Sequence, residues 1–200
     1  LIKLIEDPKL EPKIINLLGQ MPEEAVPIIG DFIKPFYSNS ADDPLLFILI
    51  RVVGNIGGEQ AKTLLGDLLQ SVAGSLLIRI SVWNALLETY EPAKDNLNPL
   101  LQLEFKGLAK LLKITLANRN KHLNNDLLKS LLQDHATVLF ELFFVLFSFE
   151  QPTDKVNKIA NEFFYSSSAG QANALELIEL LLSKSKKNLF LALFGAYLDP

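Results

Sequence analysis

Residues 43–57 read DPLLFILIRVVGNIG, an almost wholly apolar run that opens with Asp43-Pro44 and closes on glycine. Two runs of similar character follow, LLIRISVWNALLE at residues 76–88 and GQANALELIELL at residues 170–181. Each predicts a helix too apolar to bury its surface alone. Recurrence of such helices along one chain is typical of a helical solenoid, which offers a surface for binding rather than a closed reaction site.

The first run is apolar on more than one side. Helical spacing puts one set of its residues on a single face: Leu46, Leu49, Ile50, Val53 and Ile56. Ile48 and Val52 lie on other sides, so we expect this helix to sit between neighbours. Trp83 holds a matching place in the second run, and we expect it to be packed in the core rather than stacked on a ligand.

Capping signals in the sequence predict where the helices begin and end. Asp43 is the expected N-cap of the first run and Thr153 that of a later helix, while Gly57-Gly58 and Pro35 end helices. The expected helices cover residues 13–18, 22–35, 44–56, 59–69, 76–90, 97–117, 126–149, 153–164, 170–181 and 189–198. No segment alternates as a strand does.

The two long helices, joined by a polar link, predict an antiparallel hairpin. The sequence therefore predicts an all-α fold, a right-handed α-α superhelix with a long central helical hairpin. We expect one domain over residues 1–200, with N-terminal repeats over 1–92, the hairpin over 93–150 and repeat-like helices over 151–200. Because the chain begins with Leu1 and not with methionine, we expect it to be a fragment of a longer protein.

Composition excludes several classes of function. The net charge is −4, so no general basic field favours nucleic acid as a partner. The chain has no cysteine, which excludes disulfides, thiolate zinc sites and a cysteine nucleophile. The most apolar stretch, ATVLFELFFVLFSF at residues 136–149, is shorter than the roughly twenty residues of a membrane span. A buried core helix is the favoured interpretation of it, and a membrane-contacting helix is the alternative.

Residues 43–57 resemble a unit of the HEAT repeat family, in which Asp-Pro precedes the second helix and a Gly-x-Ile-Gly pattern ends it. Here these features are Asp43-Pro44 and residues 54–57, and Arg79 matches the arginine often found inside that helix. This resemblance implies paired helices stacked into a superhelix.

A second resemblance covers roughly residues 40–182. The segments LEF at 103–105, LFELF at 139–143 and QANALELIELL at 171–181 are similar, in this order, to a module that follows the membrane domain of bacterial nucleotide transporters resembling ATP/ADP translocases. The resemblance implies a non-catalytic interaction or regulatory scaffold, the soluble part of a multidomain membrane protein at the cytoplasmic face of the inner membrane. Its partners would be another protein or adjoining domains of the same chain. No transport residue can be assigned to any position.

Two alternatives stay open. A free-standing adaptor would bind a protein partner in the concave groove of the superhelix. A helical-repeat enzyme would need a basic groove with a buried carboxylate, which the negative net charge disfavours.

No catalytic residue, cofactor or metal ligand is predicted. His122 and His135 are isolated, and the pairs Glu23-Glu24 and Asp42-Asp43 are explained by their places at helix starts. Residues 54–58 lack the Lys-Ser/Thr that a phosphate-binding loop requires, so they predict a helix end.

One charge pattern offers a candidate contact site. A basic stripe follows one long helix and continues just beyond it: Lys106, Lys110, Lys113, Arg119 and Lys121. It is either a solvated helix face or an edge for contact with anionic lipid or an acidic partner. Lys184, Lys186 and Lys187 would extend it if the fold brings them close.

Overall fold

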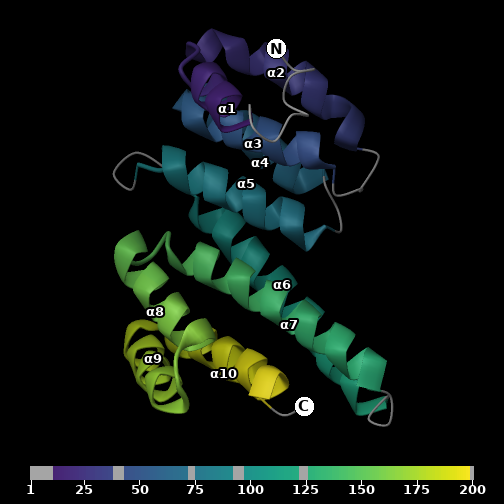
Figure 1. Cartoon of the computed structure of the whole chain (residues 1–200), viewed down its shortest axis with the longest axis vertical. Helices are drawn as coiled ribbons and strands as arrows, with labels where there is room; N and C mark the ends of the chain where they lie inside the picture. Colours follow the sequence, from purple (N-terminus) through teal and green to yellow (C-terminus); the bar gives the residue numbers. More distant parts are fainter. Residues whose placement is uncertain (1–10, 38–42, 72–74, 92–96, 122–125, 199–200) are drawn as a thin grey trace. The chain divides into compact units, whose positions relative to one another are not determined.

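The computed structural model describes residues 11–37, 43–71, 75–91, 97–121 and 126–198 (Figure 1). Within these ranges the regular elements are helices and no strand occurs, which confirms the predicted all-α class. The chain divides into two compact units, Leu1–Asp95 and Asn96–Pro200.

The first unit is a stack in which alternate helices touch. Its elements are α1 (Glu11–Gly19), the 3-10 turn η2 (Glu23–Ala25), α2 (Val26–Ile33), the 3-10 turn η3 (Lys34–Tyr37), α3 (Pro44–Ile56), α4 (Gly58–Ser71) and α5 (Leu76–Thr89). The helices α1, α3 and α5 lie side by side in that order, and α2 lies against α4 (Figure 1). Each successive pair also makes contact, from α2 with α3 to α4 with α5.

Helix α3 begins and ends where the sequence predicts. Asp43 has an extended backbone, and its carboxylate accepts a hydrogen bond of 2.8 Å from the Leu45 amide. This bond satisfies one of the amide donors that the first turn leaves unpaired. At the other end Gly57 and Gly58 adopt φ values of 70° and 86°, a conformation that glycine tolerates best. Residues 54–57 therefore form the expected helix end, and Gly58 begins α4.

The contact between α3 and α5 is close because both helices carry small residues there. A Cβ built on Gly54 would come within 2.9 Å of the Ala85 Cβ and 3.0 Å of its Cα. Trp83 is 0% exposed, which confirms its predicted core position. Arg79 of α5 donates a hydrogen bond of 3.1 Å to the Leu69 carbonyl near the end of α4, where a cation is favourable.

The second unit contains five helices in its described residues: α6 (Asn98–Lys121), α7 (Asp126–Phe147), α8 (Thr153–Tyr165), α9 (Ser168–Leu181) and α10 (Lys184–Leu198). The rings of Phe105 and Phe143 lie 6.0 Å apart, and Thr115 Oγ1 lies 3.0 Å from His135 Nδ1. Because the partner on α7 falls in number as the residue on α6 rises, the two helices run antiparallel, as the predicted hairpin requires.

Phenylalanines form the core of this unit. Phe140 lies 4.9 Å from Phe163 and 5.6 Å from Phe190, measured between ring centroids. These three residues are buried on α7, α8 and α10, and α10 also packs against α6. Aromatic pairs at such distances add to the stabilisation that their burial gives.

One described helix is long and apolar enough to cross a membrane by length and composition, in the window Ser130–Phe147. Its second half is buried by protein: Phe140, Phe143 and Phe147 are each 0% exposed. A core helix of a folded domain passes the same composition test, and burial among phenylalanines agrees with the core-helix interpretation.

Three sequence predictions in the second unit are wrong. Helix α6 continues to Lys121 and does not end at residue 117. Thr153 is not an N-cap, because Pro152 occupies that position and no side chain caps α8. Helix α10 begins at Lys184 and not at Leu189. Two ion pairs hold its basic first turn in place, Lys186 with Glu150 in the segment after α7 and Lys187 with Glu179 of α9.

Candidate functional site

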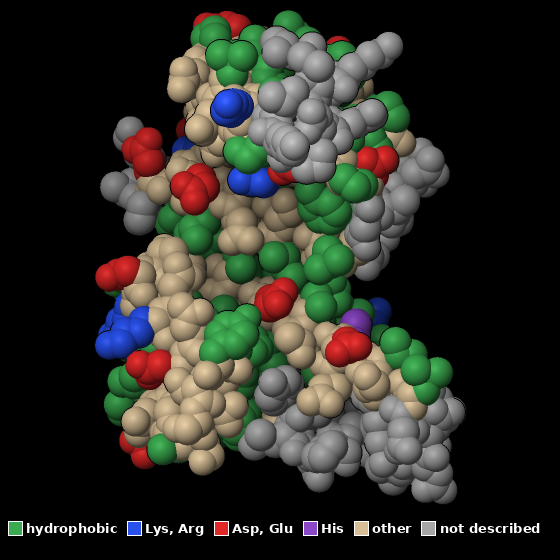
Figure 2. All heavy atoms as spheres, in the orientation of Figure 1, with side chains coloured by type: hydrophobic (Ala, Val, Ile, Leu, Met, Phe, Trp, Pro, Cys, Tyr) green, Lys and Arg blue, Asp and Glu red, His purple; other side chains and the backbone are tan. Residues whose placement is uncertain are grey.

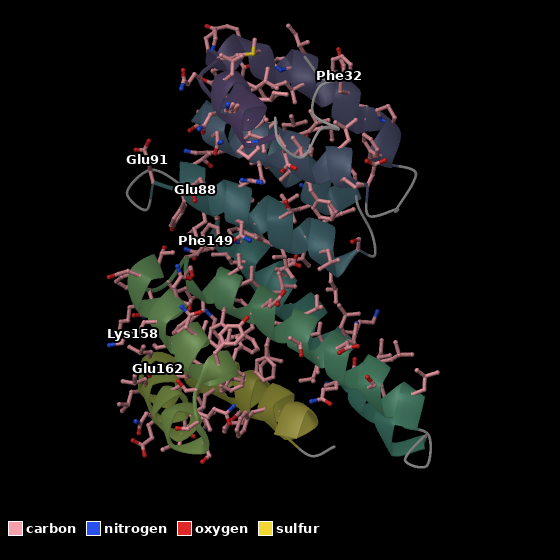
Figure 3. All side chains as sticks on the ribbon, viewed as in Figure 1. Phe32, Glu88, Glu91, Phe149, Lys158 and Glu162 are labelled. Atoms are coloured by element: carbon pink, nitrogen blue, oxygen red, sulfur yellow. The ribbon has the colours of Figure 1, made fainter. Side chains whose placement is uncertain are left out.

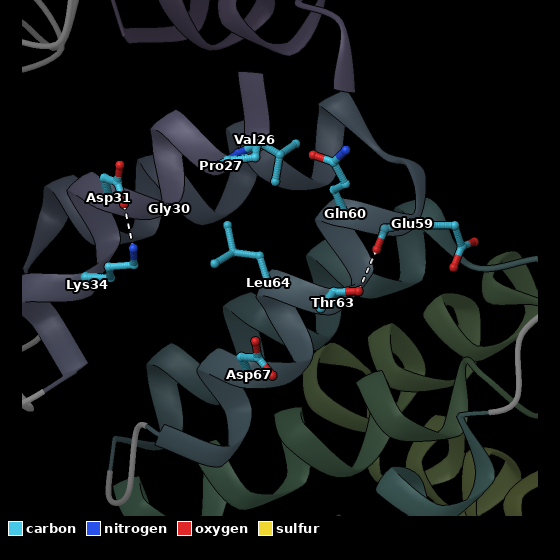
Figure 4. Close-up of a pocket in the computed structure, with 10 residues that line it drawn as sticks. All are labelled: Val26, Pro27, Gly30, Asp31, Lys34, Glu59, Gln60, Thr63, Leu64 and Asp67. Carbon is cyan, nitrogen blue, oxygen red and sulfur yellow. Dashed lines mark hydrogen bonds and ion pairs between the residues drawn. The ribbon is translucent and has the colours of Figure 1, made fainter. Parts of the chain in front are cut away.

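A groove of about 590 Å³ lies between α2 and α4 in the first unit (Figure 4). Ten residues line it: Val26, Pro27, Gly30, Asp31 and Lys34 from α2 and η3, and Glu59, Gln60, Thr63, Leu64 and Asp67 from α4. Its volume is within the range of ligand and peptide sites. In Figure 4 the Leu64 side chain extends from α4 toward α2.

The groove is shaped by the packing of α2 on α4. Ala61, Leu65 and Leu68 form the buried face of α4, so Leu64 is left half-buried beside the groove. A Cβ on Gly30 would come within 3.3 Å of a Leu64 methyl group, so glycine allows the two helices to approach here.

The end of the groove is fixed by a long-range cap. The Glu23 carboxylate accepts a hydrogen bond of 2.6 Å from the Gln60 amide in the first turn of α4. A Cβ on Gly58 would lie 2.3 Å from the Glu23 carboxyl carbon, so this position has no room for a side chain. A carboxylate is favourable at the positive end of a helix. Glu23 therefore stabilises the start of α4, as its expected place at a helix start allows.

The rim of the groove carries more acid than base. Asp31, Glu59 and Asp67 face one lysine, Lys34, among the lining residues. Lys34 lies 2.6 Å from Asp31, but both side chains are largely exposed, so the pair contributes little to stability. Such a rim around apolar residues suits a partner that has both apolar and basic side chains.

Helix α2 also exposes apolar side chains away from the groove. Ile28 is 63% exposed and Phe32 is 46% exposed. They lie four residues apart and so share one helix face. Figure 3 labels Phe32 on this helix.

A smaller and more polar hollow of about 330 Å³ lies between α3 and α5. Gly54 and Ala85 lie in it, with Arg51, Asn55, Ser81, Asn84 and Glu88 also lining it. Glu88 is labelled in Figure 3. Arg51 lies 3.5 Å from Glu11 of α1, so part of its charge is already balanced.

The predicted basic stripe is only partly described. Lys106, Lys110 and Lys113 are exposed on α6, whereas the side chains of Arg119 and Lys121 lie outside the described residues. On the face shown in Figure 2, acidic and basic side chains are interspersed.

Lys106 also lines a pocket of about 510 Å³ in the second unit, together with Lys186 of α10. The Lys186 ammonium lies 4.6 Å from the centroid of the Phe105 ring and pairs with Glu150. Burial lowers the pKa of Lys186 from its ordinary value. The fold thus brings Lys186 to the basic helix, as the sequence allowed.

The histidines form no site in the described residues. His135 is half-buried beside Thr115, and burial lowers its pKa, which favours the neutral ring. His122 lies outside the described residues. In the part of the chain that the structure describes, no cluster of three or more His, Cys, Asp or Glu could hold a metal ion.

No protein-family model, curated protein or solved structure matches this chain.

Sequence reasoning missed the groove between α2 and α4. Its two sides come from residues 26–34 and 59–67, which the fold brings together across α3. The sequence shows the carboxylates of residues 59–67, but it does not indicate which helix faces these residues.

Proposed function

We propose that this chain is a non-catalytic, HEAT-like helical-repeat scaffold that binds a protein partner through the groove between α2 and α4. The observation that carries the proposal is the stacking in the first unit, where α1, α3 and α5 touch in series and α2 touches α4. Helix pairs stacked in this way leave extended grooves on their surface, which repeat proteins use for binding.

The apolar lining and acidic rim of the groove indicate which side chains the partner carries. Its apolar lining of Val26, Pro27 and Leu64 would receive apolar side chains, and the carboxylates of its rim would face basic ones. An amphipathic basic segment of another protein, or of an adjoining domain, fits both requirements.

The resemblance to a transporter-attached module supports the wider proposal. In this wider proposal, the region is the soluble cytoplasmic part of a membrane protein at the inner membrane. The alternative is a free-standing adaptor. Fractionation of the full-length gene product distinguishes the two. We expect it in the membrane pellet after an alkaline wash, whereas recovery in the soluble fraction would favour the adaptor.

The basic stripe enters the proposal as a secondary contact with anionic lipid. Lys106, Lys110 and Lys113 are exposed and available for it. Vesicle co-sedimentation tests this contact, because equal binding to neutral and anionic vesicles would remove it.

Site-specific photo-crosslinking tests the groove itself. A photoreactive residue at Thr63, which lines the groove, should give an adduct in cells that express the full-length protein. The same residue at Gln70, exposed on α4 outside the groove, is the control. The adduct should disappear in the double variant Asp31→Lys, Asp67→Lys. Equal adducts from both positions, or an adduct that survives the charge reversal, would contradict the proposal.

A further inference from the structure

The pocket in the second unit has the composition of a small-molecule site. Its lining comes from one face of α6 between Asn98 and Ala109, from Glu150 after α7, and from Ser183, Lys186 and Leu189 at the start of α10. Leu189 and the small exposed parts of Leu101 and Phe105, which are 4% and 8% exposed, supply an apolar surface. Two lysines and the side-chain amides of Asn98 and Gln102 supply polar groups, and ligand sites commonly combine an apolar lining with a few polar groups.

The charge of this pocket is positive. Lys106 and Lys186 oppose a single carboxylate, Glu150. Glu150 pairs with Lys186, so Lys106 adds the second positive charge at the exposed side of the pocket. A ligand that enters beside both lysines should therefore be an anion.

The first turn of α10 adds to this field in an unusual way. Lys184, Lys186 and Lys187 occupy it, and no acidic residue does. Cations at the positive end of a helix are unfavourable, and the free amides of a first turn favour an anion such as phosphate. Lys186 and Lys187 offset part of this cost through their ion pairs with Glu150 and Glu179, whereas Lys184 is exposed.

The aromatic surface of the pocket indicates which group the ligand carries beside its anionic part. The Lys186 ammonium lies over the Phe105 ring at 4.6 Å, so a charged group and an apolar surface are adjacent in the pocket. A bare inorganic ion would use only the charged part. A phosphate joined to a flat or apolar body would use both.

We propose that this pocket binds a soluble small phosphomonoester, with its phosphate between Lys106, Lys186 and the first turn of α10 and its apolar body against Phe105, Leu101 and Leu189. This site is separate from the groove of the proposed function and does not depend on it. In this pocket, the carboxylate of Glu150 competes with the phosphate of the ligand for Lys186.

The test is a titration of the whole chain with 1-naphthyl phosphate, followed by amide NMR and calorimetry. We expect saturable shifts at the pocket amides of Gln102, Ala109 and Ser183. Lys106→Gln and Lys186→Gln should each weaken binding by about tenfold, because each removes a charge-assisted hydrogen bond. Lys110→Gln, exposed on the same helix but not lining the pocket, should bind as the parent does.

A fourth variant should change the affinity in the opposite direction. Glu150→Gln should tighten binding by about threefold, since it removes the competing carboxylate. If Lys186→Gln does not fold, Lys106→Gln at its exposed position still decides the question.

Several results would overturn the proposal. One is equal loss from Lys110→Gln and Lys106→Gln, which would show unspecific charge attraction. Another is equal affinity for inorganic phosphate, which would exclude the apolar surface. A third is binding to phosphatidic acid vesicles with no binding of naphthyl phosphate, which would assign the lysines to a membrane surface.

Discussion

Helices α3 and α9 have similar apolar patterns but very different surroundings. Helix α3 touches α1, α2, α4 and α5, and its buried residues are Leu46, Ile48, Leu49, Ile50, Val52, Val53 and Gly54. Helix α9 packs mainly against α8 and buries only Ala174 and Ile178. Leu180 of α9 is 82% exposed.

The difference lies in the polar residues between the apolar ones. Helix α9 carries Glu176 and Glu179 among its leucines, whereas α3 has one charged residue, Arg51. Carboxylates restrict burial to one narrow face, because an unpaired buried charge is costly. Recurrence of leucine in a sequence is therefore not equivalent to recurrence of a packing environment.

The largest effect is expected where the two helices differ most. Leu49→Ala in α3 should destabilise the chain by about 2–5 kcal/mol, because Leu49 is 1% exposed and its loss leaves a cavity. Leu180→Ala in α9 is the matched control and should change stability by less than about 0.5 kcal/mol. Urea unfolding followed by far-UV circular dichroism measures both. Equal losses would show that α9 is buried as α3 is.

A smaller effect is expected from the close contact between α3 and α5. Gly54→Ala places a methyl group 2.9 Å from the Ala85 Cβ, and the contact includes Ala85 backbone atoms that cannot move freely. We expect a loss of about 1–3 kcal/mol from overpacking. The measurement is unfolding followed by the fluorescence of Trp83, which is the only tryptophan of the chain and lies in α5.

Gly66→Ala in α4 is the control for this substitution. No atom lies within 4 Å of the added Cβ, so the general preference of helices for alanine should stabilise the unit by about 0.5–1 kcal/mol. If both glycine variants are stabilised, α3 and α5 are not in tight contact.

Local signals in the sequence predicted much of the fold. Asp43-Pro44 and Gly57 set the bounds of α3, because the cap and the helix end depend on residues that are adjacent in the chain. The hairpin of α6 and α7 was predicted from another local signal, the polar link between two long helices. The start of α10 was not predicted, since one of its ion pairs joins Lys186 to Glu150, 36 residues away in the chain.

The candidate sites also combine features that the local sequence predicts with features that only the folded structure shows. The sequence identified Lys106 as part of a basic helix, but not the pocket that it shares with Lys186. Both the pocket and the groove between α2 and α4 are formed by residues far apart in the chain. Only tertiary packing brings such residues together, and a single sequence carries no local signal for it.

Helix starts give the next comparison between the units. Asp43→Ala should cost about 1 kcal/mol, because it removes the cap bond to the Leu45 amide. Thr153→Ala should cost less than about 0.5 kcal/mol, since Thr153 caps nothing and is exposed. Thermal unfolding of the two variants measures the contrast. A larger loss for Thr153→Ala would show that its hydroxyl does cap α8.

The smallest expected effect is a change of stability with pH. It depends on His135, a histidine of the second unit. Burial lowers the pKa of His135 below its ordinary value of 6.5, so the folded state favours the neutral ring. The unfolded chain then binds a proton more readily, and stability is lost as pH falls below 6.5 through the folded pKa. We expect the parent protein to unfold at a lower urea concentration at about pH 5.5 than at about pH 7.5. His135→Gln should reduce this shift, because glutamine cannot titrate. A shift of the same size in the variant would assign it to carboxylates or to His122 and remove His135 as its cause.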